Sequence, residues 1–278
     1  MSDRPLPIAG TWYPGDATTL SREITDYLAR ADSEPPPGTI FGIVVPHAGY
    51  HYSAQTAAYA FRLLRDLSPE LVTILSPLHQ AHPAPLLTTG FDAYTTPLGR
   101  VEVDGEAVGR LDSLLSKSSG HRLFRLVNDE EHSLEIELPF LQQLFGSFRL
   151  LPVMVRDQST ATVRALGAAL AETVQSRSSI IVASSDLSHF HPQTEAMRLD
   201  DELLRRLAAF DPQAVLDGEA DGSAYACGRG AIAAALWATK ALGADRVSIL
   251  RHSTSGDVTG DLHSVVGYGA AVIWRREV

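Results

Sequence analysis

The sequence predicts one α/β domain over residues 1–278, with a central, largely parallel or mixed β-sheet and helices on both faces. Apolar, β-branched runs without polar alternation recur along the chain, and such runs are typical of strands covered on both faces. Helical segments separate these runs, as in parallel sheets. No Pro/Ser-rich linker divides the chain, whose length is common for single α/β domains.

The first half begins with a helix and two buried strands. Leu20, Ile24 and Leu28 recur at helical spacing behind Asp16, a candidate N-cap, and predict a helix over 17–32. The stretch "SEPPPG" then breaks the chain. The next expected elements are a strand at 39–45 ("TIFGIVV"), a helix at 53–67 and a strand at 71–76 ("LVTILS").

The second half repeats this rhythm after a less regular segment. Residues 91–127 carry Thr, Pro and Gly punctuation that predicts irregular structure or short strands, with a helix near 105–116. The elements expected after it are a strand at 149–155, a helix at 160–175, a strand at 179–185 and closing strands at 246–250 and 265–274.

Composition excludes several classes of partner. A net charge of -10 without a Lys/Arg run argues against nucleic acid and anionic membranes, since both require a basic face. Small molecules or proteins remain. No signal-peptide pattern and no apolar stretch of membrane-spanning length occurs, so we expect a cytoplasmic protein. A single cysteine, Cys227, excludes an intrachain disulfide and fits a reducing compartment.

Three buried strands are followed by polar residues at corresponding positions. His47 follows the first strand, His79 follows the second, and Asp186 and His189 follow the third. Ligands of open α/β sheets bind outside the carboxyl ends of the strands, so these side chains should converge on one rim. A single histidine after a strand is usually a hydrogen-bonded turn residue. Their shared position favours a site.

Imidazoles collected with a carboxylate or thiolate form sites for first-row transition metals, including the two-His-one-carboxylate site of non-haem iron. Cys227 immediately precedes a predicted helix, whose dipole would stabilise a thiolate. We therefore expect a thiol pKa well below its usual value, with metal ligation or nucleophilic reactivity. A buried small hydrophobe is the alternative.

The segment "NDEEHSLEIELPFLQQLF" (128–145) predicts a helix with unusual polar residues. Asn128 and Glu131 resemble a capping box. His132 and Glu135 share a face away from the leucine stripe, and Pro139 predicts a kink because it cannot donate to the carbonyl of Glu135. A solvated, charged helix start is the alternative, but it explains His132 and the proline poorly.

A serine nucleophile is a weaker interpretation of the third strand end. Ser184 and Ser185 stand close to His189, but no GxSxG elbow is present.

Eight motifs of the chain resemble those of the Memo family, also called AmmeMemoRadiSam system protein B, in the same order. They cover nearly the whole chain: "PIAGTWYPGD" (7–16), "PHAGYHYS" (46–53), "SPLH" (76–79), "TPLG" (96–99), "DEEHSLEIELPFL" (129–141), "LPVMV" (151–155), "SSDLSH" (184–189) and "CGRGAI" (227–232). "SPLH" departs from the commoner "GPSH", which affects loop contacts and leaves His79 in place.

The resemblance implies a fold similar to the LigB-type class III extradiol dioxygenases, in which strand-end histidines hold non-haem iron. It implies that His47 and His79 are metal ligands, and that Cys227 stands where those dioxygenases have a glutamate. His189 matches their acid/base histidine. Asp186 and His132 lie in motifs that line the same pocket.

Two classes of function follow. One is a metal-dependent, dioxygenase-like redox enzyme acting on a small organic substrate, with Fe(II) the first candidate metal and Cu or Zn suited by the softer thiolate. The other is a non-catalytic metal-binding or peptide-binding module that reuses the cleft. The family name also implies cooperation with a radical S-adenosylmethionine protein.

Overall fold

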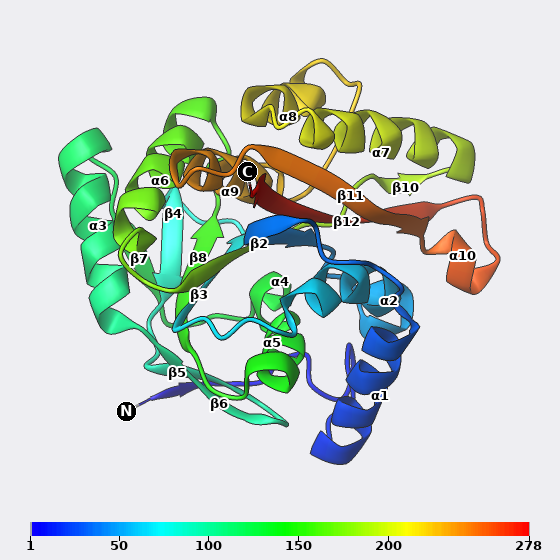
Figure 1. Cartoon of the computed structure of the whole chain (residues 1–278), viewed down its shortest axis with the longest axis horizontal. Coiled ribbons are helices and arrows are strands. Elements are labelled where there is room, and N and C mark those ends of the chain that lie inside the picture. The colour runs from blue at the N-terminus through cyan, green and yellow to red at the C-terminus, as the bar shows by residue number, and fades with distance from the viewer. Residues whose placement is uncertain (1, 278) are drawn as a thin grey trace.

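The computed structural model describes residues 2–277, which form a single mixed α/β domain (Figure 1). Its strands form one twisted sheet. Along the main path of the sheet, the strands lie in the order β1 (Asp3–Arg4), β5 (Ala93–Thr96), β6 (Gly99–Val103), β8 (Arg149–Val155), β3 (Leu71–Pro77), β9 (Ser179–Ser184), β2 (Gly38–Val45), β12 (Val265–Arg276) and β10 (His189–His191). Off this path are β11 (Arg246–Thr254), β4 (Leu86–Thr89) and β7 (Leu123–Leu126).

The centre of the sheet is parallel. Strands β8, β3, β9 and β2 pair in parallel register, whereas β12 pairs antiparallel with β2 and β11. Val45 at the end of β2 lies beside Ser184 at the end of β9. The carboxyl ends of β2, β3 and β9 therefore share one edge of the sheet, as the sequence predicts.

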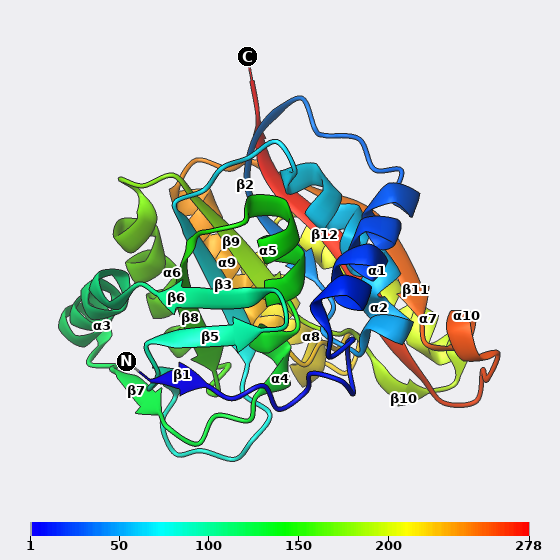
Figure 2. The ribbon, with the colours of Figure 1, turned by 90° about the horizontal axis from the view of Figure 1, so that it is seen from below.

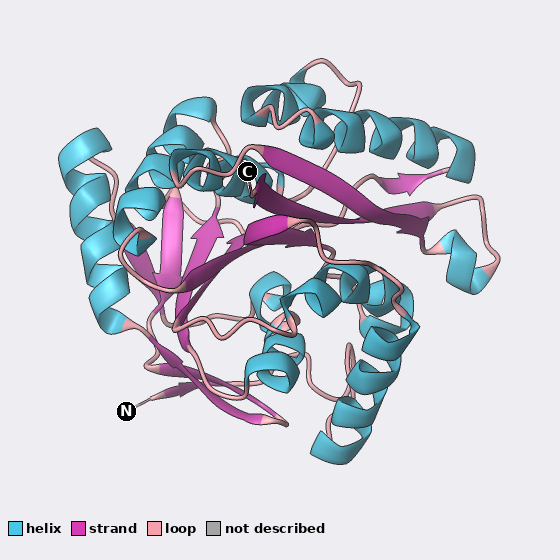
Figure 3. Cartoon of the chain, viewed as in Figure 1, coloured by secondary structure: helices cyan, strands magenta, loops and turns pink. Residues whose placement is uncertain are grey.

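Helices cover both faces of the sheet (Figures 2 and 3). One face carries α1 (Ala17–Arg30), α2 (Tyr50–Phe61), the short turn η1 (Arg62–Leu64), α4 (His132–Glu135) and α5 (Leu138–Phe145). The other carries α3 (Gly105–Ser119), α6 (Thr160–Val174), α7 (Gln193–Ala208), α8 (Pro212–Ala220) and α9 (Arg229–Ala241). A last short helix, α10 (Gly256–Thr259), follows β11.

Alternation along the strands divides the hydrophobic core into two layers. Ile43 and Val45 of β2 pack with the layer of α1 and α2, whereas Val44 packs with that of α6 and α9. Successive strand side chains point to opposite faces, so a strand buried on both sides is mostly apolar along its length. Within residues 2–277, no helix is both long and apolar enough to cross a membrane.

The predicted fold class is confirmed, and three local predictions are corrected. The expected helix at 53–67 begins earlier, at Tyr50, and ends as an α-helix at Phe61. The expected helix over 128–145 is two helices, because Pro139 in the first turn of α5 has no N–H to continue the ladder from α4. The capping box is wrong, since Glu131 rather than Asn128 caps α4.

Candidate metal centre

The structure brings the three predicted ligands together at the carboxyl edge of the sheet. The candidate ligand atoms of His47, His79 and Cys227 all lie within 4.8 Å of one another. His47 Nε2 is 3.2 Å from Cys227 Sγ. Two ligands with metal bonds of about 2.0 Å (N) and 2.3 Å (S) lie roughly 3.1–3.6 Å apart at angles of 90–110°. The His47–Cys227 pair therefore has the spacing of two ligands of one transition-metal ion, and His79 supplies a third candidate donor nearby.

His47 is held in place from two sides. Its backbone N–H donates to Asp186 Oδ1 at 2.8 Å, which ties the end of β2 to the loop after β9. Its Nδ1 lies 2.8 Å from Ser184 Oγ, so this nitrogen is occupied and Nε2 faces Cys227. The ring is buried, and burial strongly lowers the pKa of His47, which keeps the imidazole neutral as a ligand must be.

His79 is oriented by the carboxylate of Glu131. One oxygen accepts the His79 backbone N–H at 2.6 Å, and the other lies 2.9 Å from Nδ1. Burial alone would lower the pKa of His79, but the hydrogen bond and charge of Glu131 outweigh it and raise the pKa. A carboxylate on the outer nitrogen of a ligand imidazole fixes its tautomer and increases its basicity.

Cys227 precedes α9, whose N-cap is Gly228. The backbone N–H of Cys227 donates to the Asp186 carbonyl at 3.3 Å, and Cys227 is only 9% exposed. Burial raises the pKa of the thiol far above its usual value, and the nearby Asp186 raises it further. The expected low pKa is therefore wrong for the metal-free site, because removal from water outweighs the helix dipole.

Asp186 and His189 line the same pocket without belonging to the three-ligand cluster. Burial raises the pKa of Asp186 to about 7. His189 Nδ1 lies 2.8 Å from the Leu187 carbonyl oxygen, which can only accept, so this nitrogen carries the hydrogen. Nε2 is then left with a lone pair. Burial lowers the pKa of His189, which keeps the ring neutral at pH 7 and able to accept a proton.

His132 stacks on His79 with ring centres 4.7 Å apart and an interplanar angle of 20°. Burial lowers its pKa to about 4. His79, Glu131 and His132 form a second cluster of potential ligands. Glu131, however, already accepts hydrogen bonds from the backbone N–H and Nδ1 of His79 and from the Ser133 N–H at 3.0 Å. This cluster is a support for His79 rather than a second cation site.

The pocket above these residues has a volume of about 430 Å³. It is bounded by aromatic, small and histidine side chains, and none of its lining residues is Lys or Arg. The lining comprises Thr11, Trp12, His47, Ala48, Gly49, His51, Tyr52, His79, His132, Asp186, His189, Val266 and Tyr268. The absence of Lys and Arg from the lining leaves no permanently charged side chain to pair with a carboxylate or phosphate of a ligand.

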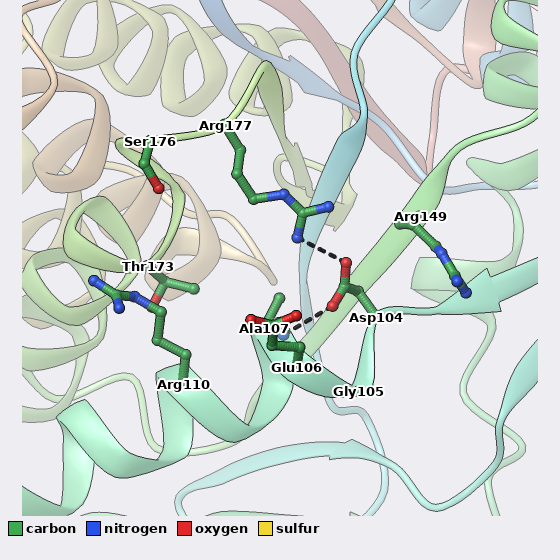
Figure 4. A pocket seen from close by; sticks show the side chains of 9 residues that line it. All are labelled: Asp104, Gly105, Glu106, Ala107, Arg110, Arg149, Thr173, Ser176 and Arg177. Carbon is green, nitrogen blue, oxygen red and sulfur yellow. Dashed lines mark hydrogen bonds and ion pairs between the residues drawn. The ribbon is translucent and has the colours of Figure 1, made fainter.

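A second pocket, of about 590 Å³, lies at the opposite edge, where β8 and β9 begin (Figure 4). Arg110, Arg149 and Arg177 line it, but each side chain already has a protein partner. Figure 4 shows Arg177 bound to Asp104, which also caps α3. No candidate metal cluster of the described residues lies there. The chemistry-bearing groups gather at the histidine pocket.

Sequence reasoning missed the residues that hold the ligands. The sequence pattern around Glu131 indicates only helix capping, and that around Ser184 indicates only a disfavoured nucleophile. Arg4, which received no role, is 1% exposed and pairs with Asp129, whose carboxylate accepts the Glu131 N–H. Its position two residues from the described start of the chain gave no signal of this burial. A buried arginine requires carboxylates around it, which is a structural fact that spacing does not reveal.

Comparisons with known proteins agree with the motifs. A family model described as Memo-like protein matches residues 4–272. A MEMO1 family protein of Nitrosopumilus maritimus is 36% identical over 271 residues, which cover 95% of this chain and 96% of that protein. One of Methanopyrus kandleri is 34% identical over 286 residues and covers 99% of both.

A solved structure of an uncharacterized protein from Escherichia coli K12 has a similar fold. It superposes with a TM-score of 0.51 at 13% identity, covering 84% of this chain and 99% of that one. At this identity the likeness concerns the fold alone. The family model and the two relatives extend over nearly the whole chain, and the chain therefore belongs to the Memo family.

Proposed function

We propose that this protein is a metal-dependent, dioxygenase-like redox enzyme that acts on a small organic substrate. The observation that carries the proposal is the cluster of His47, His79 and Cys227, of which the two histidines line the pocket. Three protein ligands leave coordination positions open for other molecules. Fe(II) is the first candidate metal, and Cu or Zn is compatible with the thiolate. When bound, such a metal would supply redox and Lewis-acid chemistry.

The chain's own residues would bind the substrate and move its protons. The lining lacks Lys and Arg, which favours an uncharged organic molecule beside the aromatic rings of Trp12 and Tyr268. His189, neutral and with Nε2 unprotonated, would accept a proton from a bound hydroxyl group. Asp186 would hold the backbone of His47 in position.

A peptide-binding or metal-binding module is the second candidate. A neighbouring pocket of about 340 Å³ shares Thr11, Trp12 and His51 with the histidine pocket and continues toward Glu23 and Tyr27. Two adjoining pockets favour an elongated ligand such as a peptide. A binding module needs no catalytic turnover. Its partner would be a peptide or protein, and the family name suggests a radical S-adenosylmethionine protein.

Anaerobic purification with elemental analysis would identify the metal. Oxygen consumption by the iron-loaded parent is then compared with that of His189→Ala, with catechols or a metabolite extract as substrate. The enzyme proposal expects faster consumption by the parent, because the variant lacks the base. Identical traces for the two proteins would reject catalysis through His189 and favour the module.

A further inference from the structure

Glu137 is a buried carboxyl group that the proposed chemistry does not use. It lies between α4 and α5 and is 2% exposed. Burial raises its pKa well above the usual value; the hydrogen bond with Ser184 lowers the pKa in part, and the charge of Asp186 raises it. No cationic side chain of the described residues counteracts this effect. A buried carboxylate without a cation is costly, so a neutral acid is the favoured form.

The hydrogen bonds around Ser184 require the same form. Ser184 Oγ lies 2.6 Å from the Ser133 carbonyl oxygen, 2.9 Å from Glu137 Oε1 and 2.8 Å from His47 Nδ1. A hydroxyl has one hydrogen and two lone pairs. The carbonyl can only accept, so the hydroxyl hydrogen must go to Ser133.

The two remaining contacts then need hydrogens from their other partners. His47 must donate from Nδ1, and Glu137 must donate from a protonated carboxyl oxygen, each to one lone pair of Ser184 Oγ. An ionised Glu137 would compete with Ser133 for the single hydroxyl hydrogen. One oxygen pair, at 2.6 or 2.9 Å, would then meet without a hydrogen between them.

We infer that Glu137 is a positioning residue: a protonated acid that fixes His47 through Ser184 as the tautomer with hydrogen on Nδ1. This inference deepens the proposed metal site and rests on it for its consequence, which is that His47 Nε2 keeps its lone pair toward Cys227. The two predicted histidine ligands are thus supported differently. Nδ1 of His79 contacts the anionic carboxylate of Glu131, whereas Nδ1 of His47 contacts the Ser184 hydroxyl, which accepts from the neutral Glu137.

The test begins with metal-free protein, so that it does not depend on the metal. The infrared difference spectrum of the parent minus Glu137→Gln at neutral pH should contain the C=O stretch of a protonated carboxyl group. Glu131→Gln is the matched control and should give carboxylate bands. Burial raises the pKa of Glu131, but the hydrogen bonds from His79 and the charges of His79 and His132 together outweigh burial and lower it. Carboxylate bands for Glu137 as well would overturn the inference.

Nitrogen-15 NMR of the imidazoles then reports the tautomer. Glu137→Gln keeps a donor toward Ser184 and should leave His47 protonated at Nδ1. Glu137→Met has a similar volume without a donor and should show a mixture of tautomers. Circular dichroism checks that both variants are folded, and if the methionine variant does not fold, the infrared result with glutamine still decides.

Cobalt(II) titration measures the consequence at the site. Glu137→Gln should bind within about threefold of the parent, whereas Glu137→Met and Ser184→Ala should bind roughly 10- to 100-fold more weakly, as for other residues that support metal ligands. Equal affinity and an unchanged tautomer in Glu137→Met would refute the positioning role. A parent that binds no cobalt(II) would instead refute the proposed metal site, while the infrared and NMR results still decide the state of Glu137.

Discussion

Gly228→Ala tests whether α9 must begin against the end of β9 for Cys227 to reach the histidines. A Cβ at Gly228 would lie 2.5 Å from the Ser184 carbonyl oxygen and 2.8 Å from Ser185 Cβ. Both neighbours belong to the end of the central strand and the residue after it, so neither can rotate away as a flexible side chain would. The added methyl group must therefore move the start of α9.

The size of this movement follows from the contact. Ordinary van der Waals separation is roughly 3.5 Å, so α9 has to retreat by about 1 Å. Metal–ligand distances tolerate only about 0.2 Å. Because Cys227 is the adjacent residue, its sulfur would leave the position 3.2 Å from His47 Nε2. We expect a destabilisation of about 1–3 kcal/mol, typical of overpacking, and a metal affinity at least about tenfold lower.

Urea unfolding and cobalt(II) titration measure the two effects separately. Gly109→Ala is the matched control, since a Cβ at Gly109 meets nothing within 4 Å. Gly109 lies inside α3, where alanine should stabilise by about 0.5–1 kcal/mol and leave the metal affinity unchanged. If Gly228→Ala bound cobalt(II) as tightly as Gly109→Ala does, the close approach of α9 to β9 would not position Cys227, and the reasoning would be refuted.

Three further predictions concern single groups. Iodoacetamide should alkylate Cys227 of the metal-free protein slowly at pH 7, because burial shields the thiol and raises its pKa; mass spectrometry would contradict this by showing rapid modification. Asp104→Ala should cost about 1–2 kcal/mol at pH 7, since Asp104 caps α3 and pairs with Arg177. The pKa of Asp104 is lowered on folding. This stability is therefore present above the unfolded pKa of about 3.9 and disappears as the pH falls through the folded pKa. Urea unfolding at neutral and at acidic pH would check this. Gly267→Ala should destabilise by about 3 kcal/mol in the same assay, because the added Cβ would overlap the buried Asp200 carboxylate of α7. A neutral effect would show that α7 can shift.

Much of the fold was predictable because burial on both faces leaves a clear pattern. The run at 149–155 has no polar residue after Arg149, and it is β8 with those bounds. The convergence of His47 and His79 was also predictable, since parallel strands place their carboxyl ends at one edge. Neither inference needs knowledge of side-chain contacts.

The support of the ligands was not predictable, because it depends on how a loop crosses the sheet edge. Glu131 reaches His79 across 52 residues of sequence, from a loop whose local pattern suggested only helix capping. Glu137 reaches Ser184 across 47 residues. Spacing along a single chain indicates which residues share a strand end, but it does not indicate which carboxylate stands behind which imidazole.

The thiol of Cys227 shows how magnitudes decide between opposing effects. A helix N-terminus stabilises an anion by roughly 0.3–1 kcal/mol, which is less than one pKa unit. Burial shifts the pKa of an ionisable group by up to 3–5 units. Burial therefore prevails in the metal-free protein, and the pKa of Cys227 is raised although the residue precedes α9.

The same comparison explains how the proposed site would change when a metal binds. No Lys or Arg lines the pocket, so none of its lining residues offers a permanent positive charge to a thiolate. A divalent cation would supply that charge directly, and binding would release the thiol proton because the ligand is the anion. On this argument the neutral Glu137 is consistent with the rest of the site: the thiolate of Cys227 and the carboxylate of Glu131 would balance a bound divalent cation, and an ionised Glu137 near Asp186 would add a buried anion with no cation to pair with it.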